Sequence, residues 1–222
     1  MKKIISLLLS LTLMLGCVLV LGSCGNTEEA EFTVATICQM TESTSATKMV
    51  TLIDYVKANG DTINDVYTMV VDGDDSIFEY VRTRMITPAE ALELGVSGRY
   101  YTEPTQYVYY KDGLYSTNGA DWSAAAPSLT SIKLDLREQY LKDAAITESG
   151  TDLSAKISVE NIKNVFGVEL DADGDFTIEV ETDGTNLARI NIYGKTKSGA
   201  SLSISTSYTY SKQTLNFPTP KN

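Results

Sequence analysis

Hydrophobic and polar residues alternate most regularly near the C-terminal end of the sequence. Apolar residues take every second position in three stretches, and turns at Asp183-Gly184 and Lys197-Ser198-Gly199 separate these stretches. The apolar positions are Phe176, Ile178 and Val180, then Ala188, Ile190 and Ile192, then Leu202, Ile204, Tyr208 and Tyr210. Because successive side chains of a strand point to opposite faces, this pattern predicts an antiparallel sheet with one buried face and one solvated face.

Three earlier runs are rich in β-branched and aromatic residues but lack this clean alternation. They span residues 48–57, 62–71 and 76–85. Turn sequences at 59–61 and 72–75 separate them, and each contains Gly beside Asn or Asp, which predicts a meander of three strands. In 49–53 and 67–71 apolar groups fall on both faces. These strands are therefore predicted to be covered on both sides or to line a cavity.

Helix signals lie between the predicted strands. Thr87-Pro88-Ala89-Glu90 forms a capping box for a short helix that Gly95 ends. A second capping box at 135–138 precedes apolar residues on one helical face, namely Leu136, Tyr140, Leu141 and Ala144. Ser158 is predicted to cap a helix that Gly167 ends, and the apolar spacing in 31–41 favours a helix over a strand. The remaining predicted strands are 100–110, 114–116 and 153–157.

The layout of about nine antiparallel strands, with helices between hairpins, resembles a known superfamily. Three features carry the resemblance: Tyr107–Tyr115 followed by Asp121-Trp122, a helix-rich middle, and a closing strand that ends in Leu215-Asn216-Phe217-Pro218. The layout is similar to that of bacterial lipoproteins and lipoprotein carriers with a half-barrel fold. This resemblance implies a β-dominated α+β fold, in which a curved antiparallel sheet holds two to four helices on its concave face. It also implies a cavity that takes acyl chains or other apolar ligands, although a fold does not fix a function.

The N-terminus has the form of an export signal. A basic start at residues 1–3 precedes uncharged residues 4–21, and Leu21-Gly22-Ser23-Cys24 resembles the bacterial lipobox. We expect 1–23 to be a signal peptide and Cys24 to be lipidated. We further expect 24–30 to be a short acidic tether, 31–218 a single domain and 219–222 a tail.

Two other interpretations of the N-terminus place the rest of the chain outside the cytoplasm as well. Lipidation at Cys17 would leave a short apolar region and an apolar mature end, so Cys24 is favoured. An uncleaved anchor is the other alternative, because 18 uncharged residues reach the lower limit of spanning length. The predicted location is the outer side of a bacterial cell membrane.

Charge and composition exclude several function classes. The net charge is −11, and it becomes −13 without the signal, which carries two lysines and no acidic residue. Such a surface repels phosphate backbones, so nucleic acid is not an expected partner. The chain contains no His, and it has no Walker loop, Rossmann glycine fingerprint or CxxC pair. We expect no cofactor and no enzymatic activity, and a hydrolase with two carboxylates is the remaining enzyme alternative.

Acidic residues and the remaining cysteine offer weaker candidates. Asp171, Asp173 and Asp175 invite a calcium interpretation, but the terminal Glu of such a loop is missing, so an acidic turn is favoured. The same caution applies to Asp72, Asp74 and Asp75. Cys38 is the one thiol left after lipidation, so it has no intrachain disulfide partner. We interpret it as a small buried apolar residue and keep a reactive thiol as the alternative.

Two groups of residues are candidates for binding. Met49, Ile53, Tyr67 and Met69 lie on the strands with two apolar faces and could line a cavity for a lipid or another apolar molecule. Tyr107 and Tyr109 belong to a cluster of tyrosines, which suits sheet packing or a recognition patch. The sequence therefore leaves two hypotheses, a lipoprotein that binds an apolar ligand and an envelope module that binds a protein.

Overall fold

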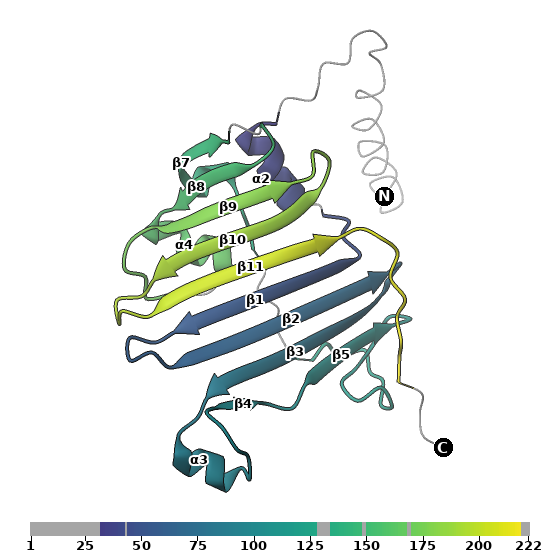
Figure 1. Ribbon diagram of the computed structural model, residues 1–222. Coiled ribbons are helices and arrows are strands. Elements are labelled where there is room, and N and C mark those ends of the chain that lie inside the picture. The colour runs from purple at the N-terminus through teal and green to yellow at the C-terminus, as the bar shows by residue number, and fades with distance from the viewer. Residues whose placement is uncertain (1–31, 43, 128–133, 148–149, 168–169, 219–222) are drawn as a thin grey trace. The chain divides into compact units, whose positions relative to one another are not determined.

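The computed structural model describes residues 32–218, apart from 43, 128–133, 148–149 and 168–169. These described residues belong to one compact unit. Leu21, Gly22, Ser23 and Cys24 of the predicted lipobox lie outside the described residues, as do the tether 24–30 and the tail 219–222. The described part is a β-dominated fold with a single curved antiparallel sheet that does not close (Figure 1), which confirms the predicted fold class.

The sheet contains eleven strands, two more than predicted. They are β1 (Lys48–Val56), β2 (Thr62–Asp72), β3 (Asp75–Met85), β4 (Tyr100–Thr102), β5 (Gln106–Lys111), β6 (Leu114–Ser116), β7 (Leu141–Ile146), β8 (Leu153–Ile157), β9 (Phe176–Thr182), β10 (Leu187–Lys195) and β11 (Ser201–Thr209). Their order across the sheet is β6-β5-β3-β2-β1-β11-β10-β9-β8-β7, and β4 pairs with β3. The N-terminal meander and the C-terminal strands are thus joined where β1 pairs with β11.

The helices of the described residues are short. They are α2 (Val34–Glu42), α3 (Pro88–Glu93) and α4 (Ile162–Phe166), with 3₁₀ turns η1 (Glu138–Tyr140) and η2 (Val159–Asn161). Within the described ranges, no helix has the length and apolar character needed to cross a membrane. The capping box of α3 is confirmed, because the Thr87 hydroxyl accepts from the Glu90 amide (3.2 Å) and the Glu90 carboxylate accepts from the Thr87 amide (2.9 Å).

The predicted helix after residue 135 is wrong. Asp135 does not cap a helix there, because its carboxylate accepts from Arg137 Nε at 2.9 Å. The chain makes only the turn η1 and then becomes β7, which pairs with β8 from Leu141 onward. Pairing with β8 at the sheet edge satisfies the backbone hydrogen-bonding groups of this segment. These bonds to a neighbouring strand outweigh the helical spacing of its apolar residues.

Three further boundaries differ from the prediction. The strand 100–110 splits into β4 and β5 around Pro104, which cannot donate to a ladder. The closing strand ends at Thr209, and no strand reaches Leu215–Pro218. The helix that Gly167 ends is present as α4, and Gly167 has φ +70°, but the Ser158 hydroxyl makes no capping bond. It accepts instead from the Asn161 side chain at 3.0 Å.

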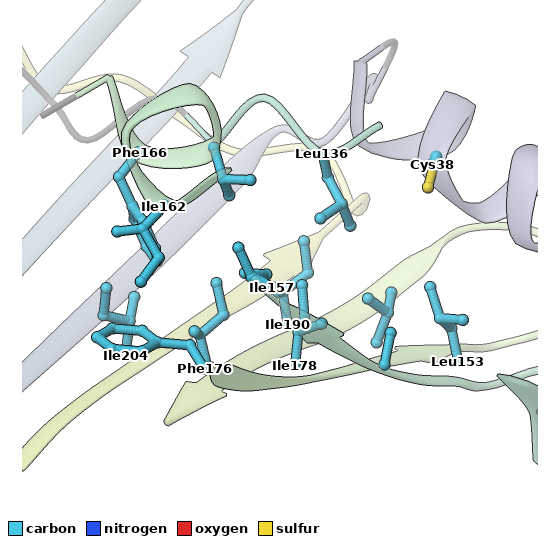
Figure 2. Packing of buried hydrophobic residues seen from close by; sticks show 14 of the residues in the cluster. Cys38, Leu136, Leu153, Ile157, Ile162, Phe166, Phe176, Ile178, Ile190 and Ile204 are labelled. Carbon is cyan, nitrogen blue, oxygen red and sulfur yellow. The ribbon is translucent and has the colours of Figure 1, made fainter. Parts of the chain in front are cut away.

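The core lies on one face of β8 to β11, which we call the inner face. Burial alternates strictly along β8 and along Phe176–Val180 of β9, and for β9 the sequence pattern predicts this alternation. Figure 2 shows Ile162 and Phe166 of α4 directed toward Phe176 of β9, while Cys38 lies on α2. A Cβ at Gly194 would overlap the Phe176 ring, so this strand position needs glycine. The helices α2 and α4 thus cover the inner face as predicted, while α3 adds no residue to this core.

The sheet is much less covered at β2 and β3. Every residue of β3 is half-buried, and in β2 only Asp65 is buried. The inner face continues across β1 to these strands, since Ile204 is paired with Ile53 and Ile53 with Asp65. Hence the same side of the sheet is a closed core at one end and a partly open surface at the other.

Candidate functional site

An open cavity of about 740 Å³ lies on the inner face where the covered part of the sheet meets the uncovered part. We call it the inner-face cavity. Its lining comes from β1, β2, β3 and β11, from the end of α2 and the residues after it, from the segment before η1 and from the end of α4. The described lining residues are Thr41, Glu42, Thr44, Met49, Thr51, Tyr67, Met69, Phe78, Leu134, Asp135, Arg137, Asn164, Gly167, Thr206 and Tyr208.

Strand register assembles the floor of the cavity. Met49 of β1 lies between Met69 of β2 and Tyr208 of β11, and Met69 in turn pairs with Phe78 of β3. These four side chains form one row across four strands, and all of them are half-buried. Methionine and aromatic side chains give a polarisable surface that adapts to irregular apolar shapes.

The second row of the floor contains polar atoms that are already satisfied. The Thr51 and Thr206 hydroxyls hydrogen-bond to each other at 2.9 Å.

The two tyrosines of the floor are uncharged. Burial raises the pKa of Tyr208 to about 12, and burial followed by the Asp65 charge raises the pKa of Tyr67. Both phenols are therefore neutral at physiological pH. The floor presents uncharged groups to any ligand.

The rim of the cavity carries the charges. Glu42, Asp135 and Arg137 are the three charged residues among the described lining. Arg137 Nε lies 2.9 Å from an Asp135 oxygen and 3.9 Å from a Glu42 oxygen. The guanidinium also lies 6.0 Å from the centre of the Tyr140 ring. One guanidinium therefore serves two carboxylates at the rim.

An ion pair between the half-buried Arg82 and the buried Asp65 adjoins the floor. Arg82 donates to both Asp65 oxygens, from Nε at 2.7 Å and from Nη2 at 2.8 Å, and the Tyr80 hydroxyl donates to Asp65 at 3.0 Å. The Tyr80 ring stacks on Tyr67 of the cavity at 4.8 Å. The pKa of Tyr80 is raised, mainly by burial and then by its bond to Asp65. This cluster fixes the aromatic side of the floor in place.

The structure brings three of the four predicted cavity residues together. Met49, Tyr67 and Met69 line the inner-face cavity, while Ile53 lies one row away in the core. Phe78, Tyr208 and the rim residues were missed by sequence reasoning. The register of β3 and β11 places Phe78 and Tyr208, while α2 and the segment before η1 bring in the rim residues. The spacing of residues within each segment gave no sign of a shared site.

Tyr107 and Tyr109 lie on the opposite, outer face. Their rings stack at 5.7 Å, and Tyr109 also contacts Phe217 at 6.3 Å between ring centres. Phe217 in turn packs on Trp122 at 6.2 Å, and Lys111 Nζ lies 5.4 Å from the Phe217 ring centre. The C-terminal segment thus covers Tyr109, which is buried, and leaves Tyr107 half-buried.

The acidic candidates are not gathered into one site. Asp171 pairs with Lys197 at 3.2 Å, and Asp175 lies 3.4 Å from Lys142 and accepts from the Val159 amide. Among the described residues, no three acidic, Cys or His side chains lie together as a metal would require. The Asp72–Asp75 segment forms the hairpin turn between β2 and β3, with Gly73 at φ +62°.

Cys38 is buried in α2 and belongs to the core cluster. Burial, followed by the charges of Glu138 and Glu42, raises the pKa of its thiol to about 11. A thiol with so high a pKa holds almost no thiolate at neutral pH, which favours the apolar role over the reactive one.

A larger hollow of about 930 Å³ surrounds α3. Five of its thirteen lining residues are charged, and no aromatic side chain lines it. Its central cation, Arg84, is held by Glu90 at 3.0 Å and by Glu103 at 3.4 Å. The inner-face cavity, with three aromatic rings and two methionines on its floor, is the better candidate for an apolar ligand.

Comparison with protein-family models and with curated proteins finds no match to this chain.

Proposed function

We propose that this protein is a lipoprotein held on the outer side of a bacterial cell membrane, and that its inner-face cavity binds an apolar or amphiphilic molecule. The lipobox pattern at Leu21–Cys24 supports the anchor. Two or three acyl chains, at about 0.8 kcal/mol per buried CH₂, suffice for stable attachment.

The observation that carries the ligand proposal is the half-buried row of Met49, Met69, Phe78 and Tyr208 in a cavity of about 740 Å³. Ligand pockets in proteins span roughly 300–1,000 Å³ and are mostly apolar with a few polar groups. Burying apolar surface is favourable by about 25 cal/mol per Å². A ligand that covers this row would therefore gain free energy that the empty protein lacks.

Site-specific photocrosslinking in intact cells tests the ligand proposal. A photoreactive phenylalanine analogue at position 69 of the full chain should capture a small apolar molecule, seen as a defined mass increase. The matched control places the analogue at Val70, because adjacent residues of a strand face opposite sides. Equal adducts at both positions, or none at position 69, would contradict the proposal.

The anchor is tested separately. Radiolabelled palmitate should enter the wild-type protein and should not enter Cys24→Ala. The Cys24→Ala protein should also keep its signal and migrate as a longer chain. A protein that never takes up palmitate, and that fractionates with membranes regardless of residue 24, would overturn the proposed location.

A second candidate function is recognition of an envelope protein on the outer face. The aromatic group of Tyr107, Tyr109, Trp122 and Phe217 favours it, because such side chains form contact surfaces at low entropic cost. Crosslinking in intact cells should then trap one dominant partner protein. If Tyr107→Ser leaves that crosslink unchanged, this patch is not the contact surface.

A further inference from the structure

The charges around the inner-face cavity favour some ligand head groups over others. This inference rests on the proposed function, in which the cavity binds an apolar or amphiphilic molecule. Three charged residues line the cavity among those the structure describes, and two of them are acidic. Arg137 is the single cation, and Asp135 holds it at 2.9 Å. Glu42 lies further away, at 3.9 Å, and about half of its side chain is exposed. The rim residues that the structure describes therefore carry a net charge of −1, with Glu42 incompletely matched.

The neighbouring ion pair does not change this balance. Arg82 and Asp65 neutralise each other through two hydrogen bonds at 2.7 and 2.8 Å. The chain as a whole is also acidic, with a net charge of −11 that includes these rim residues and the signal, so the surrounding potential is negative as well. An anionic head group at the rim would have to displace Asp135 from Arg137 or face Glu42 unpaired. Either outcome costs free energy.

The aromatic floor favours the opposite charge. Tyr67, Phe78 and Tyr208 present three rings to the cavity. A cation over the face of such a ring gains about 0.5–1 kcal/mol at exposed sites and about 2 kcal/mol when desolvated. Aromatic rings and a surplus carboxylate in the lining of one cavity are a combination that suits an organic ammonium group.

We propose that the inner-face cavity prefers an amphiphile with a cationic head group over one with an anionic head group. The alkyl chain lies over Met49, Met69 and Phe78, and the ammonium group lies toward Glu42 and Asp135. An uncharged head group is tolerated, because it is neither attracted nor repelled by the charges at the rim.

Three photoreactive alkyl probes of equal chain length test this preference in membranes that contain the full chain. They differ only in a trimethylammonium, hydroxyl or carboxylate head group, and labelling is read through an alkyne tag. For each probe we compare the wild type with Glu42→Gln/Asp135→Asn, so that partitioning of the probe into the membrane cancels. Glu179→Gln is the matched control, because it removes a charge from the exposed outer face of β9.

We expect the ammonium probe to label the wild type about five times more strongly than it labels the double variant. Labelling by the carboxylate probe should be lower than in the double variant, where Arg137 loses its carboxylates. The hydroxyl probe should label both equally, which also reports intact folding, and Glu179→Gln should resemble the wild type. If the carboxylate probe shows the larger wild-type preference, or if neither charged probe changes, the charge preference is wrong. If the hydroxyl probe fails to label the cavity at all, the proposed function itself fails.

Discussion

The two ends of the sheet share one inner face but differ in how that face is covered. On β8 to β11 it packs against α2 and α4, and Ile157, Phe176 and Ile178 are fully buried. On β2 and β3 the corresponding positions hold Met, Tyr, Phe, Arg and Asp, and all of them except the buried Asp65 are half-buried. Stability should therefore reside mainly in the covered end, whereas the open end is the part that we propose as a binding surface. The predictions below test this division.

The largest contrast concerns two phenylalanines. Phe176→Ala removes a fully buried ring that packs on Phe166, so it should lower the free energy of unfolding by about 3–5 kcal/mol. Phe78→Ala removes a half-buried ring at the cavity and should cost only about 1–2 kcal/mol. Urea denaturation measures both. Equal losses would show that the open end is as well packed as the core.

The next effect concerns the ion pair at the open end. Asp65→Asn leaves the Arg82 guanidinium without its charged partner, and should cost about 1–3 kcal/mol because Arg82 keeps partial contact with water. Asp171→Asn, which breaks an exposed pair with Lys197, is the control and should change stability little. Trp122, the single tryptophan, reports unfolding near β6. If Asp65→Asn unfolds no earlier than the control, the pair is not structural.

A smaller effect is expected at α3. Thr87→Ala removes the hydroxyl that accepts from the Glu90 amide and should lower the local stability of α3 by about 1 kcal/mol. Because α3 contributes nothing to the core cluster, global unfolding should not change. Hydrogen exchange should become faster at Glu90, which loses its acceptor, and at Ala91, Leu94, Gly95 and Val96, whose amides donate to backbone carbonyls of this helix and its end. Faster exchange in β9 would contradict the division.

The smallest effect is at Tyr208, which stands where the two ends meet. Its pKa is raised from 10.0 to about 12, so the folded state holds the phenol proton more tightly than the unfolded state. The resulting stability is complete below about pH 10 and is lost as the pH rises toward 12. Tyr208→Phe should match the wild type at pH 7 and lose less stability between pH 10 and 12. Identical pH profiles would contradict the burial of this phenol.

The sequence by itself determined most of the strands. The alternation along Phe176–Val180 of β9 and Leu202–Thr206 of β11 follows from one wet and one buried face, whereas β10 has a register shift near Leu187 and three consecutive buried residues. The hairpins at Gly60 and Gly73 follow from turn chemistry that tolerates positive φ. The capping box at Thr87 was equally local and was predicted correctly. Such features depend on residues close together in the chain, so a pattern of a few residues suffices.

Only the tertiary structure decided which residues form the candidate site and where the chain departs from its local sequence pattern. The apolar residues after Asp135 have helical spacing, yet the segment becomes β7 because its backbone hydrogen-bonds to β8. Met49 and Met69 were predicted to face a cavity, but Phe78, Tyr208 and Glu42 join them through the pairing of β1 with β11 and of β2 with β3, together with the position of α2. Pairing between segments far apart in sequence sets which side chains meet, and no local periodicity encodes it. The reason is physical: side-chain direction is a local property of a strand, whereas neighbours across the sheet are fixed by the free energy of the whole fold.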